Sequence, residues 1–144
     1  MPTRSARTDW TGTFAEGSGK VELTSSGLGT FTTSFPTRSA DTANGSTSPE
    51  ELIAAAHSAC YAMQLSAIIG EAGGTPIALD VTADVTLGPD TPGFKLTGIK
   101  LTLRGEVEGL DAEGFAKAAQ LAKEMCPVSK ALTGVEITLD AALV

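Results

Sequence analysis

Polar and apolar residues alternate along the N-terminal part of the chain, up to Phe35. Alternation with a period of two is typical of half-buried strands, and glycines mark the turns between them. The pattern predicts three short antiparallel strands over Trp10–Glu16, Lys20–Ser25 and Thr30–Phe35. The segment that follows, Pro36–Ser48, is rich in small polar residues and predicts a loop that carries Arg38.

A clear helix start follows this loop, in the sequence Ser48-Pro49-Glu50-Glu51. Serine is a preferred N-cap, proline suits the first helical position, and a glutamate three residues after the cap completes a capping box. The helix is predicted to run to about Glu71, before two glycines. Its segment Leu52–Gly70 has no charged residue and is long enough for a membrane span. Its many alanines favour a helix buried within protein instead, so no membrane partner is expected.

The remaining pattern predicts two strands, a pair of helices and a last strand. The strands are expected over Ile77–Leu87 and Phe94–Val107, and the last one over Val135–Val144. Asp111 can cap a helix, and a further short turn is expected over Val128–Leu132. The expected buried face of the Asp111-capped helix consists of Phe115, Ala118, Ala119, Ala122 and Met125. This order predicts an α+β fold and a single domain over residues 1–144.

The long apolar helix also predicts an oligomer. At 1.5 Å per residue it is about 33 Å long, and one small sheet cannot cover all of its faces. We therefore expect a homodimer in which the two central helices are buried together.

Composition narrows the classes of function. The chain has 144 residues, of which 42% are hydrophobic, and a net charge of −7 with its lysines and arginines scattered. This balance argues against nucleic-acid binding. No apolar segment follows the N-terminal arginines, so no signal peptide is expected and the cytoplasm is the predicted location. Thiols stay reduced there, and two cysteines favour catalysis, sensing or metal binding over a structural disulfide.

The two cysteines have different surroundings. Cys60 lies in the middle of the long helix, whereas Cys126 precedes Pro127 and can occupy a helix N-cap. The thiolate is the reactive form, and a helix N-terminus favours an anion. Local physics alone therefore ranks Cys126 as the better nucleophile. The alternative is that both are small buried apolar residues.

His57, three residues before Cys60, has three interpretations: a partner for the thiolate, a metal ligand, or a polar residue satisfied within the packed helix. A zinc site of His57, Cys60 and Cys126 lacks the paired close spacings of structural zinc sites, so no metal is expected.

Arg38 and Glu50 are candidates for tuning a thiol. Arg38 is either a solvated surface charge or the cation that lowers the pKa of Cys60, with Glu50 holding its guanidinium by a bidentate pair. The capping box accounts for Glu51 and leaves Glu50 without a structural role. Glu50 precedes Cys60 by about 15 Å of helix. If Glu50 serves Cys60, it does so across a dimer interface.

Several motifs together resemble the OsmC/Ohr family of thiol-dependent hydroperoxide peroxidases. They are the run Ser48-Pro-Glu-Glu-Leu-Ile-Ala-Ala-Ala-His-Ser-Ala-Cys60, Met63 and Cys126-Pro127-Val128-Ser129. The similarity extends from Trp10 to Asp140. His57 stands where the organic-hydroperoxide-resistance branch usually has an aromatic residue, so the chain is more similar to the osmotically inducible OsmC branch.

The resemblance implies an intertwined homodimer whose antiparallel sheets wrap around paired central helices. It implies that Cys60 attacks an organic hydroperoxide, and hydrogen peroxide more weakly, and that Cys126 resolves the product as a disulfide. This reverses the local ranking of the two thiols. Arg38 and Glu50 match the family's catalytic arginine and its glutamate, a lipoyl-type dithiol is the expected reductant, and no cofactor is expected. A non-catalytic redox sensor of the same fold is the alternative.

Overall fold

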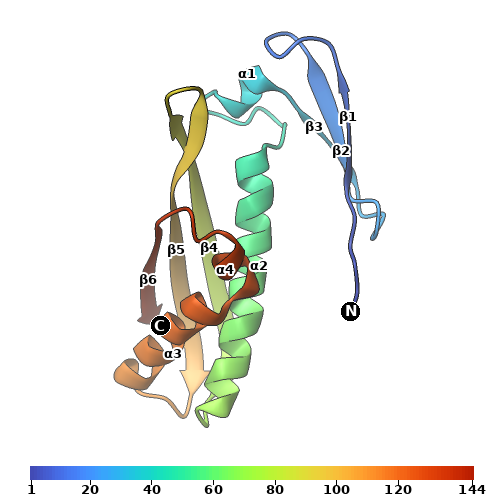
Figure 1. The fold of residues 1–144 in the computed structure, drawn as a ribbon. Coiled ribbons are helices and arrows are strands. Elements are labelled where there is room, and N and C mark those ends of the chain that lie inside the picture. The colour runs from blue at the N-terminus through green and yellow to red at the C-terminus, as the bar shows by residue number, and fades with distance from the viewer. The chain divides into compact units, whose positions relative to one another are not determined.

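The computed structural model describes residues 1–144 and divides them into two compact units, Met1–Leu52 and Ile53–Val144. The boundary falls inside a helix, α2, rather than in a linker. The strands and helices of each unit are labelled in Figure 1.

The first unit contains a three-stranded antiparallel meander in the order β1-β2-β3. The strands are β1 (Arg7–Thr11), β2 (Ser18–Glu22) and β3 (Thr30–Thr33). The meander was predicted, but the first strand ends earlier than expected. Gly12 has φ of 93° and the Gly17 N–H donates to the Thr13 carbonyl at 2.8 Å, so residues after Gly12 form the turn rather than the strand.

The predicted loop after the meander contains a one-turn helix, α1 (Phe35–Arg38). The Ser34 hydroxyl accepts a hydrogen bond from the Thr37 N–H at 3.3 Å, which is N-capping geometry, and Pro36 lies in the first turn. The expectation of a loop was therefore wrong at Arg38, which is the last residue of α1.

The long helix α2 (Pro49–Glu71) has the predicted bounds. The Ser48 hydroxyl accepts from the Glu51 N–H at 3.2 Å, as expected for the N-cap. The Glu51 carboxylate instead accepts from the Thr47 hydroxyl at 2.7 Å. By length and composition α2 could cross a membrane, and 28% of its apolar window is buried.

The second unit packs α2, α3 (Ala112–Met125) and α4 (Pro127–Ala131) with a three-stranded sheet (Figure 1). The strands β4 (Thr75–Pro89) and β5 (Phe94–Glu108) are antiparallel. The last strand, β6 (Ile137–Leu143), pairs in parallel with β5, with Leu101 opposite Leu139. An all-antiparallel arrangement was expected, but α3 and α4 form a crossover that returns the chain in the same direction as β5.

The core of the second unit lies between one stripe of α2, the inner face of β5 and α3. Every second residue of β5 from Ile99 to Gly105 is buried, and α3 contributes the predicted face except Met125, which is exposed at the end of the helix. The Asp111 carboxylate caps α3 by accepting from the Gly114 N–H at 2.7 Å. The buried core side chains include Tyr61, Leu65, Ile69, Leu101, Leu103, Phe115 and Ala119.

Much of α2 is left uncovered by the rest of the second unit. Its buried stripe in the second unit consists of His57, Tyr61, Leu65, Ile68 and Ile69, spaced at helical intervals. Met63, on another face, is 69% exposed. The second unit thus buries one face of α2, whereas the sequence predicted a helix covered on nearly all sides, in part by a partner chain.

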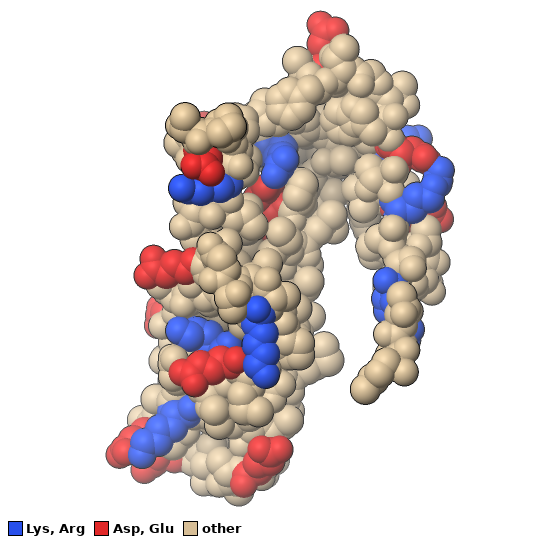
Figure 2. Space-filling model, viewed as in Figure 1, with Lys and Arg blue, Asp and Glu red and all other residues tan.

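One face of the molecule shows how its charged side chains are distributed. On the face shown in Figure 2, lysines and arginines lie scattered and interspersed with acidic residues. This distribution lacks the basic stripe of a nucleic-acid-binding face.

Candidate active site

The structure brings the four predicted site residues together as two pairs. Arg38 lies against Glu50 in the first unit, and Cys60 lies against Cys126 in the second unit.

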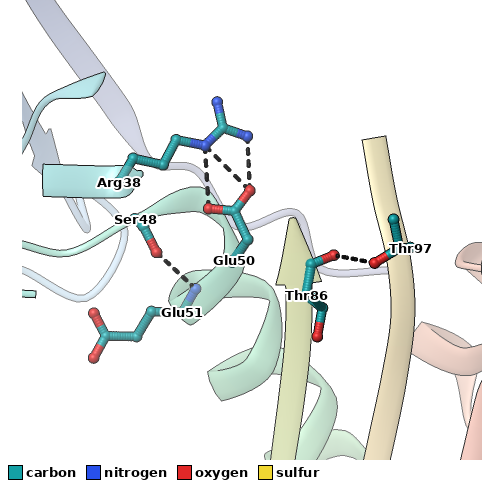
Figure 3. A network of polar contacts seen from close by, with 6 residues as sticks. All are labelled: Arg38, Ser48, Glu50, Glu51, Thr86 and Thr97. Atoms are coloured by element: carbon teal, nitrogen blue, oxygen red, sulfur yellow. Dashed lines mark hydrogen bonds and ion pairs between the residues drawn. The ribbon is translucent and has the colours of Figure 1, made fainter. Parts of the chain in front are cut away.

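Arg38 and Glu50 form a bidentate ion pair (Figure 3). The Arg38 Nε donates to both carboxylate oxygens, at 3.2 and 3.1 Å, and one terminal nitrogen donates to Oε1 at 2.7 Å. The side chain of Glu50 is 10% exposed and that of Arg38 is 30% exposed. Glu50 therefore has the structural partner that the sequence suggested, and the guanidinium keeps its third nitrogen free of this pair.

The pKa of the Glu50 carboxyl is lowered overall. Burial raises it, but the Arg38 hydrogen bonds, the Glu50 N–H, the Arg38 charge and the Ser48 hydroxyl together outweigh burial. Glu50 is an anion at neutral pH, so it can hold a guanidinium in a fixed orientation.

A pocket of about 400 Å³ opens beside the Arg38 guanidinium within the first unit. Its walls are largely aromatic and aliphatic. Besides Arg38, they consist of Thr8, Trp10, Phe14, Val21, Thr33, Ser34, Phe35, Pro49 and Leu52. An apolar cavity with one cationic group suits a molecule with a hydrocarbon body and a polar oxygen function.

Cys60 and Cys126 are both free thiols, and Cys60 packs against the buried cluster that contains Cys126, so the two side chains influence each other's acidity. Cys60 projects from α2 and is half-buried, whereas Cys126 is 0% exposed and belongs to the core of the second unit. Cys126 ends α3 and is also the N-cap residue of α4. A reactant from solvent can reach Cys60 more easily than Cys126.

Cys126, the less accessible thiol, is the more acidic of the two. Burial raises the pKa of Cys126. The Ser129 N–H, the Cys60 thiol, the Ser129 hydroxyl and the Val128 N–H lower it by more, so the pKa of Cys126 is lowered overall. The sulfur makes no side-chain cap hydrogen bond of ordinary geometry, so these groups act by proximity at the start of α4.

Burial raises the pKa of Cys60, and its neighbour Cys126 raises it further despite the Val128 N–H. These directions agree with the expectation that a helix N-terminus favours an anion at Cys126, on which its ranking as the better nucleophile was based. Cys60, the accessible thiol, needs a cation to become a thiolate at neutral pH.

His57 is fully buried, and its Nε2 atom lies 2.7 Å from the Ser129 hydroxyl oxygen. Burial lowers the pKa of His57, so the imidazole is neutral. No three His, Cys, Asp or Glu side chains are grouped so that they could hold a metal ion. Ser129 was not singled out as a site residue from sequence. Its place in the Cys126-Pro127-Val128-Ser129 motif was the available signal.

Similarity to known proteins identifies the family to which this fold and this pair of thiols belong. The family model described as OsmC-like protein matches residues 42–140. The chain is 45% identical to peroxiredoxin OsmC of Escherichia coli over 91% of this chain and 90% of that protein. It is 34% identical to the organic hydroperoxide resistance protein OhrA of Bacillus subtilis, over 67% of each. The chain belongs to the OsmC/Ohr family, and its relatives place it in the OsmC branch.

Solved structures agree with this assignment. The organic hydroperoxide resistance protein OhrB of Bacillus subtilis has a TM-score of 0.73 at 28% identity, covering 96% of this chain and 98% of that one. The organic hydroperoxide resistance protein of Elizabethkingia anophelis has a TM-score of 0.77 at 26% identity, covering 99% of both chains. The predicted α+β fold of the OsmC/Ohr type is confirmed.

Proposed function

We propose that this protein is a cysteine-based peroxidase that reduces organic hydroperoxides to alcohols, with Cys60 as the attacking and Cys126 as the resolving cysteine. The observation that carries this assignment is the contact between two free thiols, one half-buried and one fully buried. Membership of a family of hydroperoxide-reducing proteins supports the reaction class.

The reaction has three balanced steps. The Cys60 thiolate attacks one peroxide oxygen, the O–O bond breaks, and the products are Cys60 sulfenic acid and an alkoxide that takes up a proton to become the alcohol. Cys126 then attacks the sulfenic sulfur, and the disulfide forms as the hydroxyl leaves with the Cys126 proton as water. An external dithiol reduces the disulfide through a mixed disulfide and is itself oxidised.

Arg38 supplies the positive charge in this scheme. Its guanidinium would lower the pKa of the Cys60 thiol and hydrogen bond a peroxide oxygen, while Glu50 fixes its orientation. The apolar pocket beside Arg38 supports an organic substrate, since a hydrocarbon tail gains free energy from burial and hydrogen peroxide has none.

We infer that the complete site forms between two copies of the chain. Glu50 and Cys60 lie on one continuous helix, α2, about 15 Å apart along its axis. The exposed apolar face of α2, which includes Met63, supports a second copy as its cover. The assembly is then a homodimer, and we propose the cytoplasm as its location and a lipoyl-type dithiol as its reductant.

Steady-state reduction of cumene hydroperoxide with dihydrolipoamide tests the proposal. Wild-type protein should turn over, Cys60→Ser should lose all activity, and Cys126→Ser should reduce a single equivalent and then stop. Failure of the wild type to turn over, despite reversible disulfide formation, would favour a redox sensor or a different reductant. Peroxide reduction that survives in Cys60→Ser would refute the assignment of the nucleophile.

A further inference from the structure

A buried polar contact joins α2 to α4 and involves the residue three before Cys60 and the residue three after Cys126. His57 on α2 is 0% exposed and Ser129 on α4 is 5% exposed, and the His57 Nε2 atom lies 2.7 Å from the Ser129 hydroxyl oxygen. The other ring nitrogen of His57, Nδ1, is the one buried side-chain nitrogen or oxygen without a hydrogen-bond partner. A buried unpaired polar atom is costly, so its retention calls for an explanation.

Ser129 belongs to the immediate surroundings of Cys126. It lies in the first turn of α4, of which Cys126 is the N-cap residue. The side chain of an N-cap residue faces the first helical turn, so the Ser129 N–H and hydroxyl are neighbours of the Cys126 sulfur, which makes no side-chain capping hydrogen bond with α4. One hydroxyl therefore contacts an imidazole nitrogen at 2.7 Å and is a neighbour of a thiol that the proposed reaction uses.

The hydrogen positions follow from counting donors. The Ser129 hydroxyl has one proton, and if it donates to sulfur, the hydroxyl oxygen must accept from His57 Nε2–H. A neutral imidazole then carries no proton on Nδ1, so the unpartnered atom is a bare acceptor. The opposite tautomer would bury an unpaired Nδ1–H donor and turn the Ser129 proton away from Cys126, and orphaned buried N–H groups are the rarer case.

We propose that Ser129 is a catalytic residue that donates a hydrogen bond to the Cys126 thiolate during disulfide formation, and that His57 is the positioning residue that directs the Ser129 hydroxyl toward the sulfur. This inference rests on the proposed role of Cys126 as the resolving cysteine. The direction of hydrogen bonding is His57 Nε2–H to Ser129 oxygen, and Ser129 O–H to Cys126 sulfur.

Neither residue changes its covalent bonds or its net protonation in this step. Cys126 supplies the electron pair for the new S–S bond, the S–O bond of the Cys60 sulfenic acid breaks, and the proton lost by Cys126 leaves with the hydroxide as water. The hydrogen bond stabilises the sulfur anion in a site from which water is excluded.

The first test measures the Cys126 thiolate alone, in a Cys60→Ala background, from its ultraviolet absorbance as a function of pH. Ser129→Ala should lower the thiolate fraction at neutral pH about tenfold, the usual effect of losing one hydrogen bond to a charged group. Ser129→Thr keeps a hydroxyl and should recover most of the thiolate. A second pair tests the positioning residue: His57→Leu should lower the thiolate fraction, whereas His57→Gln keeps an N–H donor and should recover it.

The second test follows single-turnover kinetics with both cysteines present. Ser129→Ala should slow disulfide formation about tenfold. It should leave the rate of sulfenic acid formation unchanged, because that step takes place on Cys60. If the two variants of either matched pair had equal thiolate fractions and wild-type circular dichroism, the inference would be overturned. The proposed peroxidase function would be unaffected by that result. Loss of the proposed function would instead appear as an inactive wild type, and the thiolate measurement does not depend on that activity.

Discussion

The Arg38–Glu50 pair offers a quantitative test of the site's electrostatic framework. The perturbation is a double-mutant cycle with Arg38→Met, Glu50→Gln and the double variant. Because the carboxylate accepts from two guanidinium nitrogens and its side chain is 10% exposed, the pair resembles hydrogen bonds to charged groups more than a surface ion pair. Such bonds contribute about 1.5–3 kcal/mol, whereas exposed pairs give about 0.2–1 kcal/mol. The 30% exposure of Arg38 puts the expected coupling near the lower limit, at about 1.5 kcal/mol.

The assay is urea unfolding of all four proteins at one protein concentration, because association would otherwise contribute to the measured free energy. The same cycle on Glu113 and Lys117, an exposed pair on α3, is the matched control and should give a several-fold smaller coupling. A coupling below about 0.5 kcal/mol for Arg38 and Glu50 would refute the claim that a fixed, partly buried ion pair forms.

The pH dependence of this coupling has a definite sign. The pKa of Glu50 is lowered in the folded protein, mainly by Arg38 acting against burial. The contribution of Glu50 is therefore fully present above the ordinary glutamate pKa of the unfolded chain and is lost as pH falls through the lowered folded value. The stability difference between wild type and Glu50→Gln should shrink on acidification, and a difference that grew would contradict the assignment.

Two further predictions concern the core and the assembly. Gly105→Ala should lower the free energy of unfolding, measured in urea, by about 1–3 kcal/mol, because the new Cβ would lie 2.7 Å from the Phe115 ring. Gly98→Ala on the same strand is the control: its Cβ meets nothing within 4 Å, so it should lower the free energy of unfolding far less. Equal costs would contradict the packing of β5 on α3. Co-refolding inactive Glu50→Gln with inactive Cys60→Ser should restore peroxidase activity if each site draws on two chains, because the mixed dimer then contains one intact site. Mixtures that exchange subunits but stay inactive would refute the shared site.

Local signals in the sequence determined the elements of this protein. The Ser48 cap, Pro49 and the glycines after Glu71 indicated where α2 begins and about where it ends, because capping and chain termination depend on neighbours along the chain. The capping of α3 by Asp111 and its buried face up to Ala122 were likewise readable from spacing. The motifs around Cys60 and Cys126 were sufficient to indicate the family.

Other features depended on contacts between distant segments. The one-turn helix that ends in Arg38 was missed, since a four-residue element leaves too little periodicity to detect. The parallel pairing of β6 with β5 was missed as well, because strand direction is decided by the path of the crossover and not by alternation within the strand.

The sequence by itself determined which residues are candidates for the chemistry, and the tertiary structure decided what surrounds them. Arg38 and Glu50 were predicted to pair, but their geometry and partial burial come from the fold of the first unit. The contact between His57 and Ser129 joins residues far apart in the chain and had no signal in local spacing. The relative acidity of the two thiols also depends on burial and on N–H groups at the start of α4. Desolvation and hydrogen bonding act through space, and only the folded chain fixes which groups lie near each other.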